Sequence, residues 1–414
     1  VALVGDSPLG GQVLAESAPL SQADHILVTF DQPDYPRLGR LLQESRGRIW
    51  VVTRQAWTGE CEPVQAGLWG WGRTLALEHP ERFGGLLDVG GLEIEQLRAR
   101  LLELMESPAA ERESAWSGQE WLVPRLSRLQ LTPGRPSLRQ DAAYLITGGL
   151  NGLGLRVARW LVEDGATSLV LVSRRAHQES EPWLQAWRAQ GIRIQTVFLD
   201  LASENAAQVL RDPVQQPLAA IFHSAGRLQD APLPQLSELH YQRVLGPKLG
   251  GAQALLQLTD PRKLDWFVLF SSTSSLLGSP GQANHAVANA CLDSLARRLR
   301  QQGVAITSIH WGFWTQIGSA SGPDAQAFAR ARSLQGMGPE SALAALQAIL
   351  ARGQVPAGPE LAVAALDWAT MGSRYGDRSL FQGWLTQPVQ IQEESRQAEE
   401  IPQTREQLVR LVRQ

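Results

Sequence analysis

The chain has 414 residues, of which 43% are hydrophobic and 19% charged, and its formal net charge at pH 7 is -3. This length suffices for one large domain or two with an ample buried core, and the charge gives no reason to expect a nucleic-acid partner. Two cysteines are too few for a disulfide framework, and the seven histidines lack metal-site spacing, so no metal is expected. The longest apolar runs are only as long as strands and no signal peptide begins the chain, so we expect a cytoplasmic protein without membrane contact.

The first 135 residues alternate between strand-like and helix-like patterns. The expected elements are strands at 25–30, 48–53 and 85–89, and helices at 38–44, 64–78 and 92–106. Such alternation predicts a parallel α/β layer. A phosphate-binding loop is missing from this half, because Gly5 and the glycines that follow lack dinucleotide-binding spacing. We therefore expect Trp69 and Trp71 in the core or at a subdomain interface rather than at a ligand.

A second α/β pattern begins near residue 144 with a glycine-rich motif. A strand at 144–146 runs into TGGLNGLG at 147–154, and an amphipathic helix pattern follows. Glycines are needed where the backbone turns sharply and approaches a pyrophosphate, which then lies on the N-H groups of the helix. With a strand before it and a helix behind it, this motif predicts a dinucleotide-binding loop.

The next strand, at 169–175, ends in Ser173, Arg174 and Arg175. An acidic residue at this place would accept hydrogen bonds from a ribose 2'-OH, whereas Arg accommodates a 2'-phosphate. The pair of arginines favours NADPH over NADH as the cofactor. The alternative interpretation is two solvated arginines that close a strand.

Polar groups gather again in the stretch 270–298. A strand at 266–270 ends in a serine pair whose second member is Ser272, and a Gly/Pro-rich loop leads to a helix that begins near residue 282. On that helix His285 and Asn289 are four residues apart, so they share one face. The remaining elements expected in this half are a helix at 339–351 and a closing strand at 363–368.

The segment SSTSSLLGSPGQANHAVANACLDSLA, at 271–296, resembles the catalytic region of short-chain dehydrogenase/reductases. In particular it looks like the ketoreductase domain of modular polyketide synthases. The resemblance implies that Ser272, Lys248 and Asn289 occupy the catalytic Ser, Lys and Asn positions of that family. The position of the catalytic Tyr, the proton donor, is occupied by His285.

The resemblance implies an α/β fold of two Rossmann-like subdomains, in which parallel twisted sheets carry helices on both faces and the first subdomain is truncated and structural. The expected boundaries are a cofactor-free subdomain at 1–137, a catalytic one at 138–375 with a substrate lid at about 315–338, and a linker toward a carrier protein at 376–414. The Pro/Gly-rich stretch 127–143 separates the two subdomains. Because the chain begins inside a strand-like run, we expect it to be a piece of a larger polypeptide.

The resemblance also implies which residues contact the cofactor and the substrate. The expected cofactor-binding residues are Thr147, Gly148, Gly149, Asn151, Gly152, Leu153, Gly154, Ser173, Arg174, Arg175, Asp200, Leu201, Ser224, Ala225 and Gly226. The expected substrate and stereocontrol residues are Leu228, Gln229, Asp230, Leu277, Phe313 and Trp314. By itself Asp200 could equally cap a helix. Asp230 matches the second Asp of the family's Leu-Asp-Asp motif, and Leu277 stands where the opposite stereochemical class has Trp, so a D-configured alcohol is expected.

The implied activity is the NADPH-dependent reduction of a β-keto thioester, carried by phosphopantetheine on an acyl carrier protein beside neighbouring synthase domains, to a β-hydroxy thioester. His285 leaves two hypotheses open. In the first, His285 or a water that it holds donates the proton, and activity is impaired because an imidazole reaches roughly 2 Å less far than a phenol. In the second, the domain binds NADPH and the carrier-bound chain without reducing the ketone, as a scaffold or as an epimerase of the α-carbon.

Overall fold

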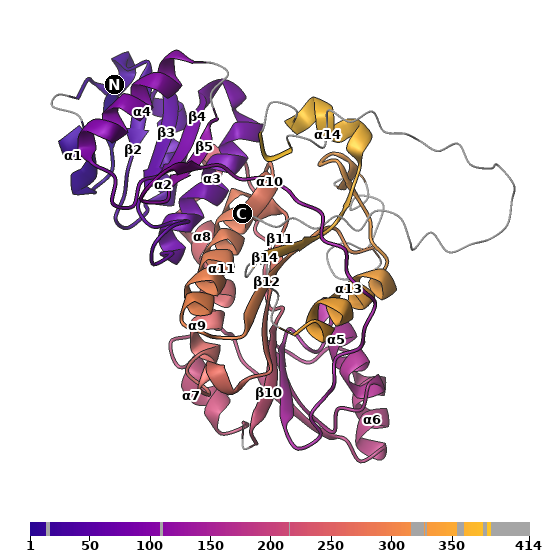
Figure 1. The fold of residues 1–414 in the computed structure, drawn as a ribbon. Helices are drawn as coiled ribbons and strands as arrows, with labels where there is room; N and C mark the ends of the chain where they lie inside the picture. The colour runs from indigo at the N-terminus through magenta and orange to yellow at the C-terminus, as the bar shows by residue number, and fades with distance from the viewer. Residues whose placement is uncertain are drawn as a thin grey trace, which may run out of the picture.

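The structure is a computed structural model in which the described residues are 1–13, 17–107, 111–214, 216–315, 327, 329–353, 360–375 and 379–381. Two large β-sheets organise them, one from each half of the chain (Figure 1). Among the described helices, none combines the length and the apolar character that crossing a bilayer requires.

The first sheet has six strands in sequential order, and its first five strands are parallel. The last strand turns back and pairs antiparallel. The strands are β1 (Ala2–Val4), β2 (His25–Val28), β3 (Arg48–Thr53), β4 (Phe83–Asp88), β5 (Glu113–Trp116) and β6 (Trp121–Leu122). The helices of this half are α1 (Pro8–Val13), α2 (Tyr35–Glu44), α3 (Pro63–Glu78) and α4 (Ile94–Glu106).

The sequence patterns located most of these elements. The strand expected at 48–53 is confirmed as β3, whereas α1, β5 and β6 were not predicted. Helix α2 begins three residues earlier than predicted, because the Asp34 side chain accepts a hydrogen bond from the backbone N of Arg37 at 2.9 Å and caps the helix there.

The second sheet has seven parallel strands in the order β14-β12-β11-β10-β7-β8-β9. They are β7 (Ala143–Thr147), β8 (Ser168–Ser173), β9 (Arg193–Phe198), β10 (Leu218–His223), β11 (Trp266–Ser272), β12 (Ile306–Trp311) and β14 (Glu360–Val363). The strand order reverses between β7 and β10, and in such sheets ligands bind in the crevice at the carboxyl ends of these strands. The order therefore confirms the expected Rossmann-like fold.

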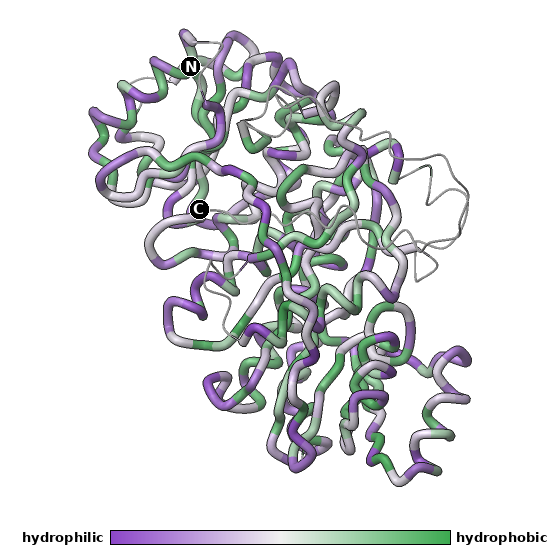
Figure 2. The backbone as a smooth tube through the Cα atoms, turned by 45° about the vertical axis from the view of Figure 1, so that its right-hand side comes forward, coloured by the Kyte–Doolittle hydropathy of each residue, from purple (hydrophilic) through white to green (hydrophobic). Residues whose placement is uncertain are grey.

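Helices cover both faces of the second sheet (Figure 1). One face carries α5 (Gly152–Glu163), α6 (Glu181–Ala189) and α13 (Pro339–Ala351), and the other carries α7 (Ala206–Arg211), α9 (Gly251–Leu255) and α11 (Ala283–Gln301). Along these helices, hydrophilic and hydrophobic residues alternate (Figure 2). Each helix buries its apolar side on the sheet, as in α5, where Val157 and Leu161 are buried.

Two details of the second half differ from the predictions. The strand predicted at 363–368 is confirmed only in part: β14 begins earlier, at Glu360, and ends at Val363, and the short β15 (Ala365–Leu366) pairs antiparallel with β13 (Leu334–Gln335). A short helix, α10 (Ser274–Leu277), also stands between the serine pair and the glycine loop. Residues 316–326 and 328 of the expected lid, and the expected linker after residue 381, lie outside the described residues.

Helix α3 of the first half packs directly on α11 of the second. A Cβ at Gly70 would lie 2.5 Å from the backbone O of Ala286, so the two helices can approach this closely only with glycine there. Trp69 and Trp71 are buried in a core that also contains Val287 of α11. The prediction that both tryptophans belong to the core or an interface is confirmed.

Candidate active site

The glycine-rich loop between β7 and α5 forms the wall of a cavity of about 220 Å³. Gly148 and Gly152 have positive φ angles of 68° and 52°, a conformation that side chains disfavour. A Cβ at Gly154 would lie 2.3 Å from the backbone O of Gly148. The loop can therefore take this shape only with glycines, and the N-terminus of α5 stands at the cavity, where its N-H groups favour an anion.

All but two of the predicted cofactor-binding residues line this cavity. The exceptions, Thr147 and Gly149, support the loop from behind. The Thr147 hydroxyl is hydrogen-bonded to His223 Nδ1 at 2.8 Å and accepts from the backbone N of Ala225 at 3.1 Å. The lining residues that the sequence did not reveal are Val172, His177, Leu199, Arg227 and Pro247.

Arg174 and Arg175 stand exposed at the mouth of the same cavity. Asp200 is also at the cavity, 3.8 Å from Arg227 as measured between Oδ2 and Nη2. Its other carboxylate oxygen accepts a hydrogen bond from the backbone N of Ala202 at 3.0 Å. Asp200 thus closes a turn and does not cap a helix, since α7 begins only at Ala206.

A second cavity, of about 710 Å³, adjoins the first and shares Leu153, Arg174, Ser224, Gly226 and Arg227 with it. Lys248, Ser272 and His285 all line the second cavity. They come from three elements that are far apart in the sequence: a π-helical turn (Gly246–Gly250), the end of β11, and the first turns of α11. The expected catalytic Lys, Ser and His therefore meet beside the glycine-rich loop.

Lys248 is 6% exposed, and its Nζ donates a hydrogen bond to the backbone O of Phe270 at 3.0 Å. Burial lowers the pKa of its ammonium group to about 8, although the carboxylate of Asp293 acts in the opposite direction. The side chain therefore still carries most of its charge at neutral pH, and this charge affects the neighbouring imidazole.

The imidazole of His285 is neutral in this cavity. Burial lowers its pKa to about 3, and the positive charge of Lys248 adds to the effect. Its Nδ1 atom is buried and has no hydrogen-bond partner among the described residues. At pH 7 His285 thus carries a single ring proton and no positive charge.

The other two residues that were expected to be catalytic differ in their access to the cavity. Ser272 is half-buried, and its hydroxyl oxygen accepts a hydrogen bond from the backbone N of Ser274 at 3.2 Å. Asn289 is fully buried and is not among the lining residues. Its Nδ2 donates to the backbone O of His285 at 2.8 Å, so Asn289 holds the helix turn behind His285.

Comparisons with known proteins agree with this geometry. Residues 142–316 match the family described as KR domain, and residues 37–126 match the family described as polyketide synthase extender module SpnB, Rossmann fold domain. A structure of A-type ketoreductases from a modular polyketide synthase is 30% identical, with a TM-score of 0.78 over 86% of this chain and 81% of that one. This chain belongs to the ketoreductase domains of modular polyketide synthases.

Two further comparisons place this ketoreductase domain among its relatives. A ketoreductase from the first module of phoslactomycin biosynthesis in Streptomyces sp. HK803 is 30% identical, with a TM-score of 0.78 over 91% of this chain and 92% of that one. The pikromycin polyketide synthase component PikAIII of Streptomyces venezuelae is 35% identical over 331 residues, which are 77% of this chain. The chain spans only 21% of the length of that synthase component.

Five of the six residues predicted to contact the substrate or control stereochemistry line the second cavity: Leu228, Asp230, Leu277, Phe313 and Trp314. Gln229 is the exception, and its backbone O accepts a hydrogen bond from Asn284 Nδ2 at 2.8 Å. The Asp230 carboxylate accepts a hydrogen bond from Gln282 Nε2 at 2.9 Å, which ties the segment 228–230 to the start of α11. Arg332 and Leu334, which lie within the expected lid, also line the cavity, as does Tyr375, which no sequence motif indicated.

Proposed function

We propose that this domain binds NADPH and reduces a carrier-bound β-keto thioester to a β-hydroxy thioester, with proton transfer as its impaired step. The observation that carries the proposal is one cavity in which Ser272, Lys248 and a neutral His285 stand beside the glycine-rich loop. Ketoreductase domains of this family are oxidoreductases that use a nicotinamide cofactor.

The residues at the first cavity fit NADPH. The loop folds so tightly at Gly154 that a Cβ there would meet the backbone of Gly148, and the start of α5 offers backbone N-H groups to a pyrophosphate. Arg174 and Arg175 would hold the 2'-phosphate, since guanidinium groups pair with phosphate through charge-assisted hydrogen bonds. When bound, NADPH supplies the hydride for the β-carbon.

The side chains of the second cavity would stabilise the oxygen of the substrate as negative charge develops on it. The Ser272 hydroxyl oxygen accepts from the backbone N of Ser274, and its proton can be donated to the substrate oxygen. The ammonium group of Lys248, held by the carbonyl of Phe270, supplies positive charge close by. Both groups are held in place before the substrate arrives, which is the condition for strong electrostatic stabilisation.

The weak point of the site is the supply of a proton. A neutral imidazole can polarise a carbonyl through its N-H group. Giving up that proton would leave an anionic ring, so His285 would have to be protonated before it could act as an efficient acid. With a pKa of about 3, only about one His285 in 10⁴ is protonated at pH 7. We infer slow reduction for this reason.

The neutral His285 also supports a second candidate function. A domain that binds NADPH and the acyl chain but transfers no hydride would act as a scaffold or exchange the proton on the α-carbon. The complete glycine-rich loop and the two arginines at its mouth support cofactor binding in both candidates.

The stereochemistry, the subdomain boundaries, the partners and the lid belong to the same proposal. The D configuration of the product is proposed from Asp230 and Leu277, and residues 1–137 and 138–375 are proposed as the two subdomains. The proposed partners are a phosphopantetheine-linked acyl chain, its carrier protein and neighbouring synthase domains. The proposed lid at about 315–338 and the linker at 376–414 would serve the delivery of that chain.

Product analysis distinguishes the two candidates. The domain is incubated with NADPH and a β-keto thioester of N-acetylcysteamine, and the products are separated by chiral chromatography. The proposal expects slow formation of a single β-hydroxy thioester and NADPH binding that calorimetry detects. Exchange of the α-proton without any alcohol would establish the second candidate, and no NADPH binding would refute both.

A further inference from the structure

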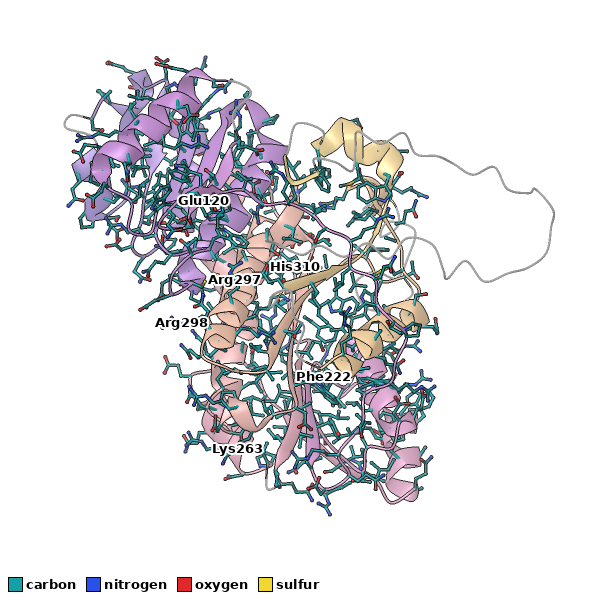
Figure 3. All side chains as sticks on the ribbon, in the orientation of Figure 1. Glu120, Phe222, Lys263, Arg297, Arg298 and His310 are labelled. Carbon is teal, nitrogen blue, oxygen red and sulfur yellow. The ribbon has the colours of Figure 1, made fainter. Side chains whose placement is uncertain are left out.

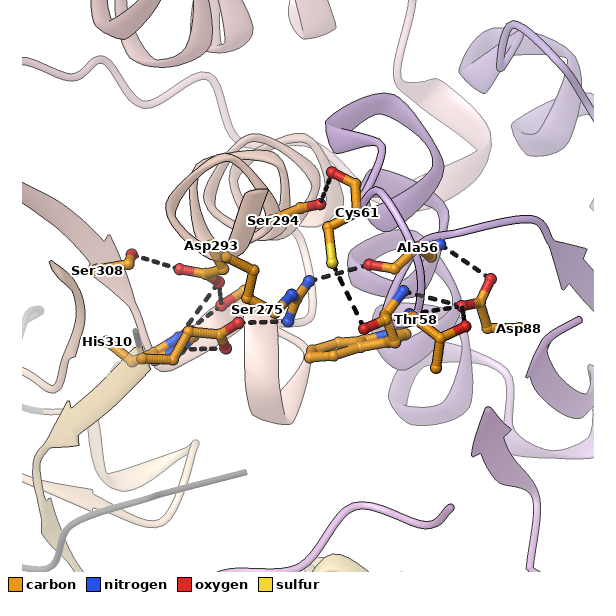
Figure 4. A network of polar contacts seen from close by, with 12 residues as sticks. Ala56, Thr58, Cys61, Asp88, Ser275, Asp293, Ser294, Ser308 and His310 are labelled. Atoms are coloured by element: carbon orange, nitrogen blue, oxygen red, sulfur yellow. Dashed lines mark hydrogen bonds and ion pairs between the residues drawn. The ribbon is translucent and has the colours of Figure 1, made fainter. Parts of the chain in front are cut away.

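A buried histidine lies between two buried carboxylates close to the active site. His310 on β12, Asp293 on α11 and Glu360 at the start of β14 are 1%, 2% and 4% exposed. His310 Nδ1 lies 3.3 Å from Asp293 Oδ2, and His310 Nε2 lies 3.1 Å from Glu360 Oε2. Figure 4 shows this cluster and its polar neighbours, none of which was assigned a role in binding or catalysis above.

The donor atoms could suggest a metal site, but their arrangement does not fit one. Asp293 contacts one nitrogen of the ring and Glu360 contacts the other. A single ion can take only one of the two nitrogens, because their lone pairs lie on different edges of the imidazole. Arg297 is also paired with Glu360, and its guanidinium group would repel a cation there.

Ser275 could likewise suggest a nucleophile, since its hydroxyl is 2.9 Å from His310 Nδ1. Ser275 is 1% exposed and lines neither of the two cavities, so a substrate could not reach it. Groups that are buried and hydrogen-bonded in this way hold a structure in place.

The structure held in place is the end of β11, which carries Ser272. The Ser275 hydroxyl is 2.6 Å from Asp293 Oδ2 and 2.9 Å from the backbone O of Ser272. His310 Nδ1 lies 3.4 Å from the same backbone O. The peptide of Ser272 is thus fixed by the cluster on one side, while its hydroxyl faces the cavity on the other.

The cluster also extends into the N-terminal half. Arg297, which is paired with Glu360, donates from Nη2 to the backbone O of Ala56 at 3.0 Å, and its guanidinium group lies 3.7 Å from the ring centroid of Trp57. Asp88 holds this loop by accepting hydrogen bonds from the backbone N of Ala56 and Trp57, both at 2.9 Å. Figure 3 places Arg297 and His310 near each other, where the two halves of the molecule meet.

A second contact reaches the same segment from α3. Arg73 donates from Nη1 to the backbone O of Ser275 at 2.7 Å, and its other guanidinium atoms pair with the buried carboxylate of Glu113. The hydroxyl of Ser275 therefore contacts the cluster, and its backbone carbonyl accepts a hydrogen bond from Arg73 of the N-terminal half.

We propose that His310, through Asp293, Glu360 and Ser275, positions Ser272 for catalysis and makes this positioning depend on the Asp88 loop of the N-terminal subdomain. His310 does not touch the substrate, so its role is positioning. The proposal rests on the proposed function in one respect, namely that Ser272 stabilises the reacting oxygen. A displacement of about 1 Å of such a group can reduce the rate about 10²-fold.

The test compares His310→Gln, which keeps a hydrogen-bonding side chain, with Asp88→Asn, which perturbs the other end of the connection. The control is His25→Gln, because His25 is a partly buried histidine of β2 that accepts from Trp50 Nε1 and lies outside the cluster. Backbone hydrogen exchange in residues 271–277 is measured on the full chain by mass spectrometry. Reduction is measured in the wild type and in a His285→Tyr background.

We expect exchange at 271–277 to become at least about tenfold faster in both test variants and to stay unchanged in the control. We expect kcat to fall at least about tenfold, with KM and the Kd for NADPH within about twofold of the parent. Unchanged exchange in His310→Gln overturns the structural connection, and faster exchange without loss of kcat overturns the positioning role. If no background reduces the ketone, the proposed function fails, while hydrogen exchange still decides whether the connection exists.

Discussion

Replacing His285 with Tyr tests whether the supply of a proton limits this ketoreductase domain. The pKa of about 3 leaves only about one imidazolium in 10⁴ at pH 7, whereas a phenol with an ordinary pKa near 10 keeps its proton. Ser272 and Lys248 are already in place, and the cavity of about 710 Å³ leaves room for the longer side chain. Because general acid catalysis contributes about 10²- to 10⁴-fold, we expect His285→Tyr to raise kcat at least about 10²-fold.

The assay follows NADPH oxidation with the N-acetylcysteamine β-keto thioester and compares wild type, His285→Tyr and His285→Phe. The Phe variant is the matched control, since it keeps an aromatic ring and removes the proton. If protonated His285 is the donor in the wild type, its rate should fall about tenfold for each unit of pH between 5 and 8, well above the pKa. A Tyr variant that binds NADPH normally but reduces no faster than wild type would refute the reasoning.

Three further predictions concern the cofactor site and stability. Arg174→Ala should weaken NADPH binding about 10- to 100-fold without weakening NADH binding, because a charge-assisted hydrogen bond to the 2'-phosphate contributes about 1.5 to 3 kcal/mol. Calorimetry follows both affinities. The control is Arg188→Ala, which removes an exposed Arg of α6 and should change neither affinity. Gly154→Ala should abolish NADPH binding through the clash of its Cβ with the loop backbone, whereas Gly372→Ala, with open space around it, should bind normally. Because the pKa of His285 is lowered in the folded state, the unfolded chain takes up a proton between about pH 6.5 and 3 and the folded chain does not. The free energy of unfolding should therefore fall on acidification through this window, by up to about 1.4 kcal/mol per pH unit from this group. Urea unfolding of His285→Phe should show a correspondingly flatter pH dependence.

The sequence alone determined the parts of this protein that depend on local backbone rules. The glycine-rich motif at 147–154 had the spacing that a sharp turn between a strand and a helix requires, and the structure has Gly148 and Gly152 at positive φ angles. The strand at 48–53 and the helix at 339–351 followed from hydrophobic periodicity and were exact. The family resemblance supplied the expected catalytic positions, because it rests on motifs that are contiguous in the sequence.

Only the tertiary structure decided what depends on distance and burial. The neutral state of His285 comes from burial and from Lys248, which is 37 residues away in the sequence but faces the same cavity. Asn289 shares the helix with His285, yet its amide turns to a backbone carbonyl instead of the cavity. His310 and Glu360 carry no motif, and they meet only because β12 and β14 are neighbours in a parallel sheet whose crossover brings distant segments together.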